Sequence, residues 1–232
     1  MRGLILAAGR GSRMGGLTED CPKGLIPLRG KPLIEHQLEA LQAAGIQEIG
    51  IVTGYRAEAF DKYGMRRFHN ARWAETNMVF SLFCAITWLK EADCMVSYGD
   101  IFYDSLLVLD LMRSDTLVSI AYDPDWLSLW RLRFTDPLQD AETFRLSPEG
   151  MLQEIGAKPS SVEEIQGQYM GLLFFRKAFW LSAPRPCDEK LFMTDFLREV
   201  IKETSIGCVS NAYPWGEVDQ PTDLEVYEHG QG

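Results

Sequence analysis

The order of apolar and polar residues predicts strands that alternate with helices along most of the chain. Short apolar runs predict buried strands at 4–8, 48–53, 94–98, 116–122 and 168–175. Apolar residues at helical spacing predict helices at 33–44, 77–89, 106–112 and 192–202. Strands and helices that alternate in this way favour crossover connections between neighbouring strands. The pattern therefore predicts an α/β fold with a mostly parallel sheet that is flanked by helices.

Three segments are less regular. The spacing over 57–63 predicts a short helix, and 66–70 is open between a strand and a loop. The segment 123–142 holds tryptophans, arginines and acids without clean periodicity, so no element is predicted there. Because no linker, repeat or low-complexity tract interrupts the chain, we expect one domain over 1–232.

Composition and charge narrow the choice of partners. The formal net charge of −10 argues against a nucleic-acid surface, which needs clustered Lys and Arg. No apolar run reaches the ~18 residues of a membrane span, so no membrane partner is expected. The five cysteines never form a C-x-x-C pair, which favours reduced thiols and a cytoplasmic location over a disulfide scaffold.

The candidate chemistry begins directly after the first predicted strand. Gly9 and Gly11 allow a tight turn that presents backbone N–H groups to a ligand. Arg13 adds a planar fork of donors that suits phosphate oxygens, and Lys23 adds a mobile positive charge. A Walker loop and a dinucleotide fingerprint both require other spacings of glycine and lysine. The stretch therefore predicts a different kind of polyphosphate site.

The same stretch resembles a known family. Leu6-Ala7-Ala8-Gly9-x-Gly11-Ser12-Arg13-Met14, followed by Pro22-Lys23 and Pro27-Leu28-x-Gly30-Lys31-Pro32-Leu33, is similar to the nucleotidyltransferases that make nucleoside-diphosphate-activated metabolites. The resemblance implies a Rossmann-like, mixed but mostly parallel sheet of the nucleotide-diphospho-sugar transferase type. It also implies catalytic roles for Arg13 on the leaving pyrophosphate and for Lys23 on the α-phosphate and the acceptor.

Nucleotidyl transfer brings two anions together, and Mg²⁺ held by carboxylates offsets their repulsion. Asp100 and Asp219 each follow a predicted strand, and the resemblance implies the same pair as metal ligands. No general base is needed, because the acceptor phosphate is already ionised near neutral pH.

The nucleotide is expected to lie between the glycine turn and the turn after the second strand. We expect Leu6, Ala8, Gly9, Gly11, Ser12 and Arg13 to bind it from the first turn, with Thr53 and Gly54 from the second. Asn77 and Ser81 are further candidates for the base or ribose, although Asn77 is equally explained as a helix cap.

The acceptor side is assigned to 123–175 and 205–228. The absence of a proline after Arg13, the segment 77–82 and Glu217-Val218-Asp219 resemble the branch of phosphocholine, phosphonate and phosphoamino-acid cytidylyltransferases. CTP is therefore the favoured nucleotide, with a small phosphate or phosphonate acceptor. The expected acceptor-binding residues are Trp126, Trp130, Arg133, Glu142, Lys158, Tyr169, Trp215 and Glu217.

Alternatives stay open on this side of the site. Tryptophan faces and acids suit an ammonium group, but packing in the core explains some of the tryptophans equally well. A sugar-1-phosphate nucleotidyltransferase and a nucleotide-sensing module without turnover are the rival functions. A homodimer is compatible with these expectations.

Overall fold

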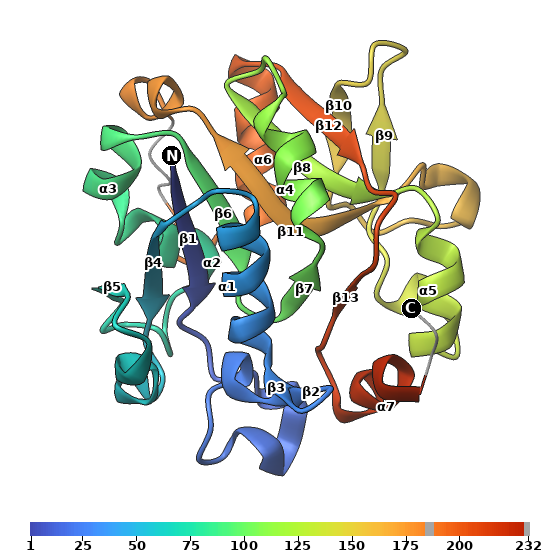
Figure 1. The fold of residues 1–232 in the computed structure, drawn as a ribbon. Helices are drawn as coiled ribbons and strands as arrows, with labels where there is room; N and C mark the ends of the chain where they lie inside the picture. The colour runs from blue at the N-terminus through green and yellow to red at the C-terminus, as the bar shows by residue number, and fades with distance from the viewer. Residues whose placement is uncertain (184–187, 230–232) are drawn as a thin grey trace.

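The computed structural model describes residues 1–183 and 188–229, and a seven-stranded sheet lies at its centre, in the order β12-β8-β11-β6-β1-β4-β5 (Figure 1). Its strands are β1 Arg2–Ala7, β4 Glu48–Thr53, β5 Arg66–His69, β6 Cys94–Tyr98, β8 Val118–Asp123, β11 Gln168–Phe175 and β12 Ile206–Ser210. Strand β11 runs antiparallel to β6 and β8, and the other neighbours pair in parallel. The prediction of a mixed, mostly parallel sheet is confirmed.

Helices cover both faces of this sheet (Figure 1). They are α1 Leu33–Ala43, α2 Met78–Phe83, α3 Ile86–Glu91, α4 Ser105–Met112, α5 Trp126–Arg133, α6 Met193–Glu203 and α7 Pro221–His229. Helices α1 and α4 pack with one apolar cluster, and α2, α3 and α6 pack with another. No helix in the described parts of the chain is long and apolar enough to cross a membrane.

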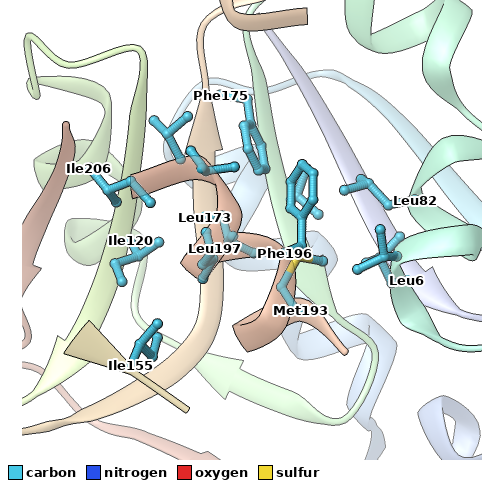
Figure 2. Close-up of a cluster of buried hydrophobic side chains, with 14 of the residues drawn as sticks. Leu6, Leu82, Ile120, Ile155, Leu173, Phe175, Met193, Phe196, Leu197 and Ile206 are labelled. Atoms are coloured by element: carbon cyan, nitrogen blue, oxygen red, sulfur yellow. The ribbon is translucent and has the colours of Figure 1, made fainter. Parts of the chain in front are cut away.

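The two clusters follow from the alternation of side chains along each strand. In β1, Leu4 and Leu6 belong to one cluster and Ile5 to the other, and all three are almost fully buried. Figure 2 shows part of the first cluster, to which β1 contributes Leu6 and α6 contributes Phe196. Because central strands such as β1, β6 and β11 are buried on both faces, they are near-continuous apolar runs in the sequence, whereas the edge strand β5 is mostly exposed.

Short pairings and turns complete the fold. The small sheets pair β2 Pro27–Leu28 with β3 Lys31–Pro32, β7 Ile101–Tyr103 with β13 Trp215–Glu217, and β9 Phe144–Leu146 with β10 Leu152–Ile155. The 3-10 helices are Ser12–Thr18, Lys23–Leu25, Ala57–Tyr63, Pro137–Gln139, Val162–Glu164 and Lys177–Leu181. Cys21, Cys84, Cys94 and Cys208 are unpaired, and Cys187 lies outside the described residues.

Two expectations about helices are wrong. The single helix expected over 77–89 is two helices, because Ala85 leaves the helical conformation between α2 and α3. Both pieces face the same apolar cluster, so the apolar spacing continues across the break. Helix α5 was not predicted at all. Trp126, Trp130 and Arg133 do lie at helical spacing on it, but a buried arginine looks like a surface residue in a sequence.

Candidate active site

The carboxyl ends of β1 and β6 lie side by side, and the chain turns sharply after each of them. The amide of Gly99 donates to the carbonyl of Leu6 over 2.9 Å, which extends the pairing past β6. A Cβ atom at Gly99 would lie 2.8 Å from that carbonyl oxygen, so the approach requires glycine. Asp100 is thereby fixed beside the glycine-rich loop, at the sheet edge where α/β proteins bind ligands.

The loop after β1 is held in one conformation by Gly11. This residue is left-handed, with φ 72° and ψ 51°, and the 3-10 helix Ser12–Thr18 begins directly after it. The hydroxyl of Thr18 donates to the carbonyl of Gly11 over 3.0 Å. A Cβ atom at Gly11 would lie 2.8 Å from Cδ of Lys23, so the stem of Lys23 packs directly on the turn.

Three carboxylates gather beside this loop. Asp100, Glu217 and Asp219 each offer an oxygen, and these oxygens lie within 4.8 Å of one another. Oδ1 of Asp100 is buried without a hydrogen-bond partner among the described residues. Carboxylate oxygens are the ligands that Mg²⁺ prefers, and a buried oxygen without a partner is available as a ligand. The residues therefore fit a divalent cation.

Two cationic side chains reach the same carboxylates. Nζ of Lys23 lies 2.8 Å from Oδ2 of Asp100 and 2.6 Å from Oδ1 of Asp219. A guanidinium nitrogen of Arg13 lies 2.7 Å from the same oxygen of Asp219. Burial by itself lowers the pKa of Lys23, but the two carboxylates outweigh it and raise the pKa to about 12. Lys23 is therefore charged at any physiological pH.

The carboxylates differ in their preferred protonation. Burial opposes the charge of Asp219, but Lys23, Arg13 and Arg133 together hold the pKa of its carboxyl below the usual range. Burial raises the pKa of Glu217 to about 8, and the neighbouring charge of Asp219 contributes to the shift. An additional cation beside the two groups would favour the ionised form of Glu217.

A cavity of about 260 Å³ opens from the loop to Asp100. Its lining includes Leu6, Ala7, Gly9, Gly11, Ser12, Arg13, Lys23, Gly24, Met78, Gly99 and Asp100. Five of the ten predicted nucleotide-binding residues, Leu6, Gly9, Gly11, Ser12 and Arg13, are thus brought together around one cavity. Sequence analysis missed Met78, which is the first residue of a helix and whose side chain offers no strong hydrogen-bonding atom.

Four of the other five, Ala8, Thr53, Gly54 and Ser81, line neither this cavity nor the one beside it. The carbonyl of Ala8 accepts a hydrogen bond from Tyr55 N, and Thr53 and Gly54 do not line the cavity. Ser81 is almost fully buried and accepts a hydrogen bond from Asn70. Ser81 therefore belongs to the interior of the fold.

A second cavity of about 280 Å³ adjoins the first, because Arg13 and Met78 line both. Its lining is acidic and aromatic: Arg13, Asn77, Met78, Tyr98, Trp130, Asp140, Glu142, Gln168, Tyr169, Phe192, Met193, Thr194, Glu217 and Asp219. It contains four predicted acceptor residues, Trp130, Glu142, Tyr169 and Glu217. Asn77, predicted for the nucleotide, lies here instead, and its amide donates to the carbonyl of Lys190.

The charges that line the second cavity favour a ligand with a positive charge. Burial raises the pKa of Asp140 and of Glu142, and the charge of Asp140 contributes to the shift at Glu142. An ammonium group beside them would relieve the cost of their ionisation. Nε1 of Trp130 and the hydroxyl of Tyr169 are buried, and the residues that carry them line the cavity beside these acids.

The other predicted acceptor residues do not line this cavity. Trp126 is 3% exposed and packs in the core. Trp215 donates its Nε1 to Asp123 over 2.9 Å and lies beside Trp130, with ring centroids 6.4 Å apart. Nζ of Lys158 donates to backbone carbonyls at 138 and 139. Trp126 and Trp215 were expected to offer aromatic faces and Lys158 its charge, and none of the three lines the cavity.

The expectation for Arg133 requires a correction. Its side chain is completely buried and pairs with Glu217, Asp219 and Asp223 instead of pointing into the cavity. The donors of the guanidinium are directed to these carboxylates. Asp223 belongs to the segment Glu217-Val218-Asp219-x-x-x-Asp223 that resembles a metal-binding segment of the family, but its pairing with Arg133 was not predicted.

Comparison of the sequence with known proteins identifies a family and several relatives. Residues 3–131 match the model of the MobA-like NTP transferase domain. The chain is 35% identical to the CTP:phosphoglutamine cytidylyltransferase of Campylobacter jejuni, over 97% of this chain and 98% of the relative. It is 36% identical to a 2-aminoethylphosphonate cytidylyltransferase of Lancefieldella rimae, over 43% of this chain and 45% of the relative.

The fold has solved counterparts. The structure of the CTP:phosphocholine cytidylyltransferase from Streptococcus pneumoniae superimposes with a TM-score of 0.72 at 25% identity. The superposition covers 98% of this chain and 97% of that one. The similarity therefore extends over both cavities.

Proposed function

The chain belongs to the MobA-like NTP transferase family, and we propose that it transfers a cytidylyl group from CTP to a small phosphate or phosphonate acceptor. An acceptor oxygen forms a bond to the α-phosphorus of CTP. The bond from that phosphorus to the bridging oxygen of the β-phosphate breaks, and pyrophosphate leaves with the electron pair. The observation that carries the proposal is the cluster of Arg13, Lys23, Asp100 and Asp219 at the junction of two adjoining cavities.

The cationic residues have distinct tasks in this proposal. Arg13 has a side chain that is 64% exposed and borders both cavities, so it can follow the triphosphate and the departing pyrophosphate. Lys23 is buried at the floor of the first cavity and is suited to stabilise charge near the α-phosphate. Mg²⁺, held by Asp100 and Asp219 with Glu217 beside them, would offset the repulsion between the two anionic substrates.

We propose further that the acceptor carries an amino or ammonium group. Asp140, Glu142 and Glu217 line the second cavity together with the ring of Trp130, and a cation over such a ring gains roughly 0.5–2 kcal/mol. The named acceptors of the three cytidylyltransferases above, phosphoglutamine, aminoethylphosphonate and phosphocholine, all contain an amino or ammonium nitrogen. The 35% identity over nearly the whole chain makes a phosphoamino-acid amide the first acceptor to test.

The test is a screen for pyrophosphate release with each of the four nucleoside triphosphates and Mg²⁺. The acceptor panel contains phosphoglutamine, aminoethylphosphonate, phosphocholine and sugar 1-phosphates. We expect release with CTP and an amino-bearing acceptor, and much slower release from a Lys23→Ala control. Release that requires a sugar 1-phosphate would replace the acceptor proposal with the sugar-nucleotide one. Release that requires a different nucleotide would refute the assignment of CTP.

A further inference from the structure

Arg133 is an unusual residue for the end of a short helix, because its side chain is 0% exposed. Its Nε donates to Oδ1 of Asp223 over 3.1 Å, and one terminal nitrogen donates to Oδ2 of the same residue over 3.2 Å. The guanidinium also lies 3.2 Å from Oε2 of Glu217 and 3.4 Å from Oδ2 of Asp219. A single buried arginine therefore contacts two of the three carboxylates in the proposed cation site.

Asp219 is held by different partners at its two oxygens. Oδ2 lies against Arg133, and Oδ1 lies against Lys23 and Arg13. The backbone amide of Asp219 donates to Oδ2 of Asp223 over 2.8 Å, so the main chain is fixed from the same side as Oδ2. One oxygen is thus directed into the protein and the other toward the cavities.

The cations on the two sides differ in their freedom to move. Arg133 and Asp223 are both 0% exposed and form a pair through two hydrogen bonds, so the guanidinium cannot leave without exposing a buried charge. Lys23 lines the nucleotide cavity and ends in a flexible chain of methylene groups. Its Nζ lies between Asp100 and Asp219, in the space that a cation bridging these two groups would need.

We propose that Arg133 is a positioning residue for the cation site. It fixes Glu217 and the inner oxygen of Asp219, and this leaves the outer oxygen of Asp219 facing Asp100. Lys23 is the opposite case: it competes with the cation for Asp100 and Asp219 and moves to the phosphates once the cation binds. This inference rests on the proposed function, since it concerns the same cation.

The roles of Arg133 and Lys23 can be distinguished by the affinity of the protein for Mn²⁺ in the absence of nucleotide. This affinity is measured from the electron paramagnetic resonance signal of free Mn²⁺. The variant Arg133→Met/Asp223→Asn removes the positioning charge together with the carboxylate that it pairs with. The side-chain oxygen of the introduced asparagine can still accept the backbone N–H groups of Asp219 and Gln220. We expect this variant to bind Mn²⁺ about 10- to 100-fold more weakly than the wild type, as is usual when a residue behind metal ligands is lost. Lys23→Met should bind Mn²⁺ roughly fivefold more tightly, because a competing cation is removed.

Matched variants separate this role from charge alone and from stability alone. Arg131→Met removes a charge from the exposed side of the same helix and should leave the affinity for Mn²⁺ unchanged. Arg133→Lys keeps the charge but lacks the planar fork, so it should restore only part of the affinity. Thermal unfolding of each variant checks that it is folded, and if the double variant is not, Arg133→Lys provides the comparison.

The outcomes are distinct. If Arg133→Met/Asp223→Asn and Arg133→Lys both bind Mn²⁺ like the wild type, Arg133 does not position the site. If loss of Arg133 tightens binding as loss of Lys23 does, the two cations act only through their charge, and the proposal is overturned. If the folded wild type binds no Mn²⁺ and releases no pyrophosphate with CTP, the proposed function itself is refuted.

Discussion

Replacing Glu142 by Gln should weaken binding of the acceptor and at the same time stabilise the fold. The backbone at this position is fixed by Gln168, whose side-chain oxygen accepts from Glu142 N and whose amide donates to Glu142 O over 2.6 Å. Gln has the same shape as Glu, so the substitution removes a charge from the acceptor cavity without moving the chain. The effect on activity and the effect on stability then have the same physical origin.

The magnitude follows from the contact that is lost. A hydrogen bond between charged groups contributes about 1.5–3 kcal/mol, and 1.4 kcal/mol corresponds to about tenfold in affinity. Asp140 and Glu217 remain in the cavity, so we expect the lower end, an acceptor KM raised about tenfold. The KM for CTP should stay near the wild-type value, because Glu142 does not line the nucleotide cavity.

The stability effect has a defined sign. Burial raises the pKa of Glu142 in the folded protein, so the folded state holds its proton to a higher pH than the unfolded state does. Ionisation of Glu142 therefore costs stability as the pH rises above the ordinary carboxyl range. Glu142→Gln removes this cost, and its Tm should exceed that of the wild type at pH 7 by more than it does at pH 4.

Initial rates of pyrophosphate release, with each substrate varied in turn, test this prediction alongside Tm. Glu149→Gln, which changes an exposed loop residue, is the control and should alter neither KM. An equal rise in KM for an amino-bearing acceptor and for a neutral one would contradict the ammonium contact. A lower Tm at pH 7 would show that Glu142 is already compensated by another group.

Three further predictions concern the neighbouring residues. Asp100→Asn should lower kcat about 100-fold or more and leave cooperative unfolding intact, as checked by rates at several Mg²⁺ concentrations. Lys23→Ala should lower mainly kcat, whereas Arg13→Ala should also raise the KM for CTP, because the triphosphate is present before and during the reaction. Trp130→Leu should raise the acceptor KM about 2- to 30-fold, whereas Trp215→Phe should change Tm and leave that KM near normal.

The glycine loop could be predicted because its chemistry is local. Gly11, Arg13 and Lys23 lie close together in the sequence, and a turn before a helix restricts where their atoms can go. The same holds for Asp100, because the end of a buried strand is visible as the end of an apolar run. For such residues, the position along the chain is sufficient to predict a place in the site.

The acceptor cavity could be predicted only in part because its lining comes from distant segments. Trp126 and Trp130 lie on the same short helix and are equally buried, but only Trp130 reaches the cavity. Thr194 and Gln168 reach it from the start of α6 and from the start of β11. The type of residue indicates what a side chain can bind, but the packing of helices decides what it faces.

For Arg133, the packing that the sequence does not reveal changes the expected chemical role. An arginine near acids at a helix end suggests a surface ion pair or an anion site, and both interpretations treat its charge as available to a ligand. Asp223 alters this interpretation, because it accepts the amides of Asp219 and Gln220 at the start of α7 and still has oxygens free for the guanidinium. That cap is a local feature of the sequence, whereas its pairing with α5 is created only by folding. A charge that is satisfied inside the fold can orient the carboxylates beside it, and a charge that borders the cavity can follow the substrate.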